Sequence, residues 1–170
     1  MRATIVGIGL SLLAAGPAWA DEPEEPFAFG YESELFVLGG LSAGGSFGSA
    51  GGGGFVGYEL SMVWLKSAAW GGLFGDIVYD FGQSAATVVV GPEFGYGFLG
   101  IDGGAAFRFG FADETEVGVQ GRLLLTLTTF SIFARYGYFP DSVGGTHIGQ
   151  VGILLKMPFY NSSDIPEVAR

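Results

Sequence analysis

The sequence predicts an all-β fold, an eight-stranded antiparallel up-and-down transmembrane β-barrel. From Phe29 to Tyr160 it forms segments of about ten residues, in which alternate positions are almost wholly apolar and the others collect glycines and charges. After residue 20 no run of about eighteen apolar residues could form a spanning helix. Because hydrocarbon forces every backbone polar group to be bonded internally, a closed sheet is the remaining way to span a membrane.

The ends of the chain differ in composition from the alternating region. Residues 1–20 combine a basic start at Arg2, an apolar stretch and the small-x-small end Ala18-Trp19-Ala20, as in a cleaved secretory signal peptide. We expect residues 21–30 to be an acidic periplasmic leader, 31–160 the barrel and 161–170 a C-terminal tail. This organisation predicts export to the bacterial outer membrane.

The charge and cysteine content exclude several classes of function. The formal net charge is −10, which argues against nucleic acid as a partner, since phosphates require a basic surface. The absence of cysteine removes disulfides, thiol catalysis and thiolate metal sites. We expect no cofactor, and stability must come from the fold itself.

The first four strands follow from an alternation of period two. The first is expected from Tyr31 to Ala43, followed by a flexible glycine loop from Gly44 to Gly54, and turns are expected at Lys66–Ala69 and Gly82–Ser84. The positions expected to face outward are Leu35, Val37 and Leu41; Val56, Tyr58, Leu60, Met62 and Trp64; Leu73, Ile77, Tyr79 and Phe81; and Val88, Val90, Phe94, Tyr96 and Phe98. Pro92 predicts a bulge or a locally broken ladder.

The last four strands continue the same pattern. Turns are expected near Gly100, at Ala112–Thr115 and at Thr128-Thr129, and a loop is expected at Pro140–Gly145. The positions expected to face outward are Ala105, Phe107, Phe109 and Phe111; Val117, Val119, Leu123, Leu125 and Leu127; Phe130, Ile132, Ala134, Tyr136 and Tyr138; and Val151, Ile153, Leu155, Met157 and Phe159.

Up-and-down threading gathers the aromatic residues into two belts, as expected at the two membrane interfaces. One belt would contain Trp64, Trp70, Tyr96, Phe98, Phe130 and Phe159, and the other Tyr79, Phe81, Phe109, Phe111, Tyr136 and Tyr138. This distribution supports the predicted register.

With these strands and belts, the chain from Tyr31 to Tyr160 resembles the small outer-membrane barrels of the OmpA and OmpX type. The last strand also resembles the signal that barrel-assembly machinery recognises, through Gln150, Gly152, Leu155 and Met157. The resemblance implies two partners, outer-membrane lipid and the assembly machinery, and leaves the oligomeric state open. The presumed outer loops are short apart from Gly44–Gly54, which weakens an adhesive role.

The inward positions collect charges that predict a network in the lumen. Its expected members are Glu34, Glu59, Asp76, Asp80, Glu93, Arg108, Glu116, Arg122, Arg135 and Lys156. Because an eight-stranded lumen is just wide enough to be filled by side chains, we expect paired charges and the inward Phe36, Phe74 and Phe133 to close it. The alternative is a narrow, water-filled path whose excess carboxylates favour cations.

Other motifs indicate a chemical function less strongly. The single histidine, His147, lies near Asp141 and Ser142, which suggests an outer-membrane lipid-modifying hydrolase, although turn residues explain the latter two. The glycine pattern of Gly95–Gly100 matches a dinucleotide fingerprint but lacks the helix that such a site needs. Asp113, Glu114 and Glu116 could hold a divalent cation, although a solvated acidic turn is the simpler explanation.

The sequence therefore favours a non-enzymatic outer-membrane barrel with a structural or surface role in the envelope, with no catalytic, cofactor or metal site. The cation-favouring pore and the hydrolase are the alternatives from other classes. A soluble lipocalin-like binder would show the reverse pattern, with its apolar set lining a cavity and its charged set facing water.

Overall fold

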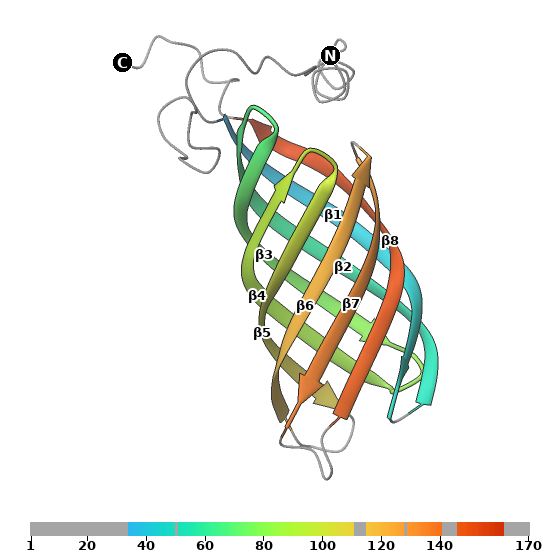
Figure 1. Cartoon of the computed structure of the whole chain (residues 1–170). Coiled ribbons are helices and arrows are strands. Elements are labelled where there is room, and N and C mark those ends of the chain that lie inside the picture. Colours follow the sequence, from blue (N-terminus) through green and yellow to red (C-terminus); the bar gives the residue numbers. More distant parts are fainter. Residues whose placement is uncertain (1–33, 50, 111–114, 128, 141–145, 162–170) are drawn as a thin grey trace.

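The computed structural model describes residues 34–49, 51–110, 115–127, 129–140 and 146–161, and these form a closed antiparallel barrel of eight strands (Figure 1). Consecutive strands are neighbours, and β8 pairs with β1 to close the sheet. The strands are β1 (Glu34–Gly48), β2 (Gly51–Lys66), β3 (Ala69–Asp80), β4 (Ala85–Tyr96), β5 (Leu99–Gly110), β6 (Thr115–Leu127), β7 (Phe130–Phe139) and β8 (Thr146–Asn161). None of the described residues forms a helix long and apolar enough to cross a membrane. The predicted fold class is confirmed.

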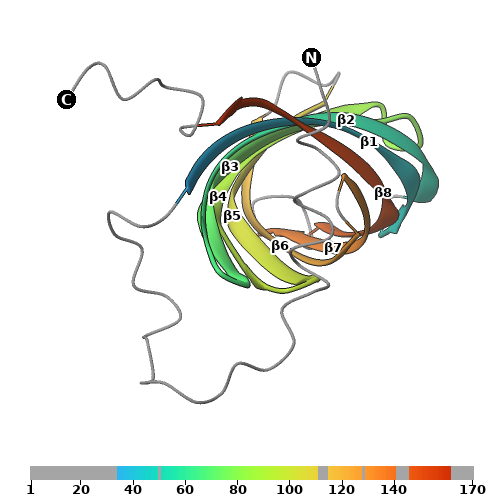
Figure 2. The ribbon, with the colours of Figure 1, turned by 90° about the horizontal axis from the view of Figure 1, so that it is seen from above.

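The strands are steeply tilted and close into a ring, which Figure 2 shows from above. A path followed from partner to partner around the barrel starts at Phe36 on β1 and returns to that strand at Ser46, ten residues farther on. This stagger is the shear that closing a tilted sheet requires. Side chains that meet across the lumen therefore come from distant parts of the sequence.

The predicted division of the strands into two faces is confirmed. Along β6, for example, Val119, Leu123 and Leu125 are exposed on the outside, while Arg122 and Leu124 are buried inside. The same alternation runs through the other strands, so that large apolar side chains cover the exterior. A strand period of two is sufficient to produce this division.

The glycine-rich segment Gly44–Gly54 was predicted as a loop, and this prediction is wrong. Residues up to Gly48 extend β1 beyond Ala43, and β2 begins at Gly51, so the two strands pair to Gly48 opposite Gly51. The glycines allow close approach of backbones: a Cβ on Gly44 would lie 2.1 Å from the Val151 carbonyl oxygen. Flexibility was inferred from composition, but paired backbone and tight packing order this segment.

The turn between β4 and β5 lies at Gly97 and Phe98, so the prediction of a turn near Gly100 is wrong. Gly97 has a φ of +57°, a conformation that glycine adopts readily, and β5 already begins at Leu99. The break predicted at Pro92 is confirmed on one side of β4. The pairing with β5 passes over Gly91 and Pro92 without a change of register, while Pro92 still pairs with Leu73 of β3.

One member of the predicted aromatic belts lies on the other face. Trp70 was assigned to the outside, but it belongs to the inward set of β3, and its ring lies against Gly95 and Gly100 on the inner wall. The absence of side chains on these glycines makes room for the indole. Trp64, which was predicted for the same belt, does belong to the outward set of β2.

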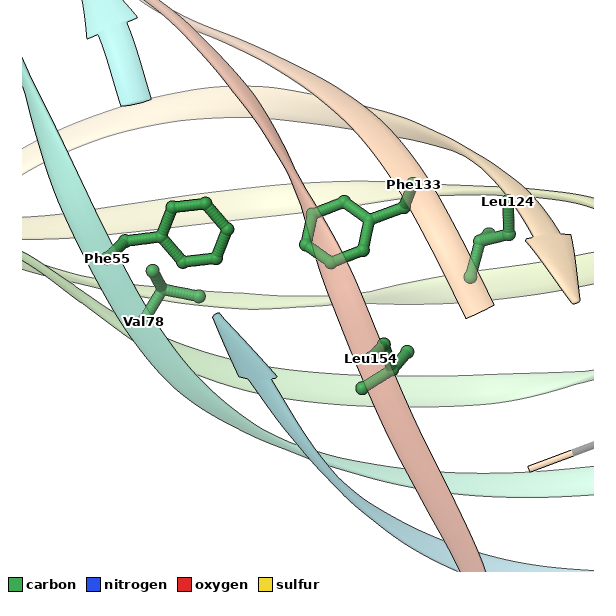
Figure 3. Packing of buried hydrophobic residues seen from close by; sticks show 5 residues of the cluster. All are labelled: Phe55, Val78, Leu124, Phe133 and Leu154. Carbon is green, nitrogen blue, oxygen red and sulfur yellow. The ribbon is translucent and has the colours of Figure 1, made fainter. Parts of the chain in front are cut away.

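The lumen contains two buried apolar clusters. One consists of Phe55, Val78, Leu124, Phe133 and Leu154, which point inward from different strands (Figure 3). The ring centroids of Phe55 and Phe133 are 5.9 Å apart. The other cluster consists of Phe74, Val89, Ala106, Phe139 and Ile148. Large rings opposite small residues thus fill much of the interior.

Several predictions lie outside the described residues. These are the signal peptide 1–20, the leader 21–30, the start of the first strand at Tyr31, Phe111 with the acidic turn residues Asp113 and Glu114, Thr128, the loop residues Asp141–Gly145 with Ser142, and the tail from residue 162 onward.

Candidate functional site: the charged lumen

Seven inward charges form a group that we call the central cluster. Each strand from β2 to β8 contributes one member: Glu59, Asp76, Glu93, Asp102, Arg122, Arg135 and Lys156. The four acids lie on β2–β5 and the three bases on β6–β8. The chain is therefore divided into an acidic half and a basic half that face each other across the lumen.

Most neighbouring strands of the barrel carry like charges in this cluster. The exception is Asp102 on β5, whose register partner on β6 is Arg122. Glu59 is the register partner of Asp76, Glu93 of Asp102, and Arg122 of Arg135. Like charges directly opposite one another on adjacent strands are destabilising. Because each of these like-charged pairs is repulsive, the charges that neutralise its members must come from other strands.

Arg122 is the centre of the cluster. Its Nη1 lies 2.5 Å from Oε2 of Glu59, and its Nε donates a hydrogen bond of 2.7 Å to Oδ2 of Asp102. Its guanidinium carbon lies 5.3 Å and 5.4 Å from the ring centroids of Phe74 and Phe133. The side chain is fully buried, so paired carboxylates and aromatic rings replace water around the charge.

The other two bases complete the bridging across the lumen. Arg135 forms an ion pair with Asp76. Nζ of Lys156 lies 2.5 Å from Oε1 of Glu59 and 3.1 Å from Oε2 of Glu93, and it donates a hydrogen bond of 2.8 Å to Ser61. These contacts join β2, β3 and β4 to β7 and β8. Apart from the pair of Arg122 with Asp102 on the adjacent strand, the ion pairs of the cluster are thus crosslinks between strands that are not neighbours in the sheet.

A second group, the rim cluster, lies at the end of the barrel where β3 turns into β4. Arg108 lies 2.5 Å from Glu116, its register partner, and donates a hydrogen bond of 2.6 Å to Oε1 of Gln83. Oδ1 of Asp80 accepts a hydrogen bond of 3.1 Å from the Gln83 backbone. The side chains of Arg108 and Glu116 retain 11% and 22% exposure, so water partly screens this pair.

The structure assembles most of the predicted lumen network and corrects it at three positions. Glu34 lies exposed at the beginning of β1 and takes part in no ion pair of the described residues, so its assignment is wrong. Asp80 is buried as predicted, but its described contact stabilises a turn. Asp102 was missed because the turn was placed near Gly100. A turn at Gly97 would have assigned Asp102 to the same face as Arg108.

The residues of the predicted assembly signal occupy both faces of β8. Gln150 is buried and accepts a hydrogen bond of 3.4 Å from Arg135, and Gly152 lies beneath the rings of Phe55 and Phe133. Leu155 and Met157 are exposed on the outside. Their recognition by assembly machinery remains a prediction.

His147 lies on the outward face of β8. Its Nδ1 is 2.5 Å from the Tyr136 hydroxyl, and its ring lies 4.9 Å from that of Tyr138. Both tyrosines belong to the predicted aromatic belt. Within the described residues no group of three or more histidine, cysteine or acidic side chains is arranged to hold a metal ion.

Comparison with solved structures identifies the same architecture. The crystal structure of neisserial surface protein A aligns with a TM-score of 0.51 at 13% identity, covering 74% of this chain and 97% of that protein. The chain has the fold of a small outer-membrane β-barrel. The predicted resemblance is thereby confirmed at the level of fold.

Two further structures align more loosely. A designed transmembrane β-barrel gives a TM-score of 0.46 at 14% identity, covering 71% of this chain and 95% of the design. The outer-membrane protein Ail of Yersinia pestis in a phospholipid bilayer nanodisc gives 0.42 at 14% identity, covering 71% of this chain and 99% of that one. No protein-family model matches the sequence, and no curated protein matches it significantly.

Proposed function

We propose that this protein is a non-enzymatic barrel of the bacterial outer membrane, with a closed lumen and a structural or surface role in the envelope. The central cluster is the observation that carries this proposal. Most of its ion pairs cross the lumen, and Arg122 and Glu93 within it have no exposed side-chain surface. A continuous aqueous path would have to displace these contacts.

The packing around the cluster supports a closed lumen. Phe55 and Phe133 belong to one buried apolar cluster, and Phe74 and Phe139 belong to the other. An eight-stranded barrel has an interior that side chains alone can fill. Charges and rings together therefore occupy the space that a porin leaves to water.

The exterior supports a location in a lipid bilayer. Leu60, Ile77, Leu123 and Ile153 are each at least 43% exposed, although they are large and apolar. A soluble protein rarely exposes a continuous apolar surface, whereas a membrane barrel carries an apolar band between aromatic belts. The full-length protein should therefore be recovered in the outer-membrane fraction, with gel migration that changes on boiling. Recovery as a soluble periplasmic protein without detergent would contradict the proposal.

The closed lumen has its own test in planar bilayers. The purified wild-type protein should show little or no steady conductance, because the central cluster and the buried rings close a narrow lumen. The four acids and three bases of the cluster are the feature that would favour a cation pore instead. Large, stable and cation-selective conductance would contradict the closed lumen and support the cation pore.

The hydrolase alternative gains no support from the described contacts of His147. A Ser–His–carboxylate arrangement needs an imidazole positioned between a nucleophile and an acid. The described side-chain partners of His147 are Tyr136 and Tyr138, at the outer surface. We therefore assign this residue to the aromatic belt.

A further inference from the structure

The central cluster contains one carboxylate more than its bases can neutralise. It has four acids and three bases, and the remaining strand, β1, contributes glycine: Gly40 is the register partner of both Glu59 and Lys156. A charge buried without a partner is costly, and the group usually acquires a neutralising partner instead. The identity of the leftover acid follows from the contacts.

Glu93 has the weakest compensation of the four acids. Arg122 lies 2.5 Å from Glu59 and 2.6 Å from Asp102, and Arg135 pairs with Asp76. Among the described bases, Glu93 pairs with Lys156 alone, at 3.1 Å, and that lysine lies nearer to Glu59, at 2.5 Å. Oε1 of Glu93 has no hydrogen-bond partner in the described residues, and the side chain is fully buried.

The backbone ladder between β4 and β5 is interrupted beside Glu93. The pairing of β4 with β5 passes over Gly91 and Pro92, directly before Glu93 and opposite the residues that follow Asp102. Because proline has no N–H, the ladder lacks a donor at this point. A buried carboxylate that is only partly compensated suits a small positive charge.

We propose that Glu93 binds one small monovalent cation, either a proton or an alkali-metal ion, which completes the charge balance of the lumen. This inference rests on the closed lumen proposed above, since water in an open lumen would solvate the extra charge. The other charged groups of the central cluster are Glu59 on β2, Asp76 on β3, Asp102 on β5, Arg122 on β6, Arg135 on β7 and Lys156 on β8. Bound cation would stabilise the closed barrel.

Two matched glutamine variants test this assignment. Glu93→Gln removes the surplus charge without changing the shape, so the refolded full chain should unfold at the wild-type midpoint temperature or about 2–4 °C above it. Glu59→Gln removes an acid that contacts both Arg122 and Lys156, so its midpoint should fall. A Glu93→Gln midpoint lowered as far as that of Glu59→Gln would overturn the proposal, because Glu93 would then be a required counterion.

The wild-type protein gives a second test that needs no variant. With an alkali-metal ion at Glu93, replacing sodium or potassium by choline at constant ionic strength lowers the midpoint. With a proton at Glu93, the midpoint temperature instead falls as the pH is raised, because ionised Glu93 is left without a neutralising charge. Either dependence should disappear in Glu93→Gln. Insensitivity of the wild type to both changes would refute cation binding, whereas bilayer conductance separately tests the closed lumen.

Discussion

The central cluster and the rim cluster contain the same kinds of side chain but connect the barrel differently. Arg108 and Glu116 in the rim cluster are register partners on adjacent strands, already joined by the β5–β6 ladder. Arg122 in the central cluster reaches Glu59 on β2, which lies across the lumen from β6. The rim pair adds to an existing contact. The central pairs other than Arg122–Asp102 instead link strands that the backbone ladder does not join directly.

Burial separates the two clusters energetically. Removing one partner of a buried ion pair leaves an uncompensated charge and typically costs about 3–5 kcal/mol, whereas exposed pairs contribute roughly 0.2–1 kcal/mol. The Arg122 side chain has no exposed surface, but Glu116 retains 22%. The comparison teaches that an inward position alone does not determine how much a charge contributes to stability. That contribution also depends on which strands the charge connects and on how far it lies from water.

The largest expected effect comes from Arg122→Met, which keeps an unbranched side chain but removes the charge. Glu59 and Asp102 would each lose a buried ion pair, so we expect the free energy of unfolding to fall by about 3–5 kcal/mol. Denaturant titration of the refolded protein in detergent measures this change. A loss comparable to that of a surface pair would show that water already screens the central cluster.

The next effect concerns the opposite face of the same strand. Leu123 follows Arg122 directly but is 63% exposed on the outside, near the middle of β6. An arginine at this position should cost about 2–4 kcal/mol, because it would lie near the bilayer midplane. Leu127→Arg is the matched control, since it lies on the same face at the end of β6 and should be much milder. Equal insertion and stability of the two variants would contradict the proposed membrane depth.

The sequence predicted the faces of the strands better than their ends. Alternation is set by the strand period alone, so residues such as Glu59 and Arg122 could be assigned to the lumen without knowledge of the fold. The ends depend on backbone geometry that composition does not reveal. Gly44–Gly54 was therefore mistaken for a loop, and Asp102 was separated from β5 by a misplaced turn.

The pairing of the charges could not be predicted from the strand pattern. Which acid meets Arg122 depends on the stagger of the sheet, because the register brings β2 and β6 together only after closure. Trp70 was misassigned for a related reason. Its aromatic character favoured the membrane interface, but the two glycines beneath its ring lie on the inner wall. Such complementarity is visible only in three dimensions.

A smaller effect is expected for Arg108→Met in the rim cluster. The substitution removes the contacts with Glu116 and Gln83, but the partly exposed carboxylate can be solvated. The free energy of unfolding should fall by roughly 0.2–1 kcal/mol, measured under the conditions used for Arg122→Met. A loss as large as that of the central variant would mean that burial does not distinguish the two clusters.

The smallest effect is expected for His147→Phe on the outer surface. Phenylalanine keeps a ring beside Tyr138 but cannot form the hydrogen bond with the Tyr136 hydroxyl, a contact worth about 0.5–1.5 kcal/mol at most. Because His147 contributes to an aromatic belt rather than to catalysis in this proposal, envelope lipids should be unchanged when the variant replaces the wild type. Mass spectrometry of extracted lipid A, with a deletion strain as the reference, measures this directly. The contrary outcome would be a lipid A modification that is absent from the deletion strain and from the His147→Phe strain, although the variant protein is present at the wild-type amount. This result would indicate an active site at the outer surface and overturn the non-enzymatic assignment.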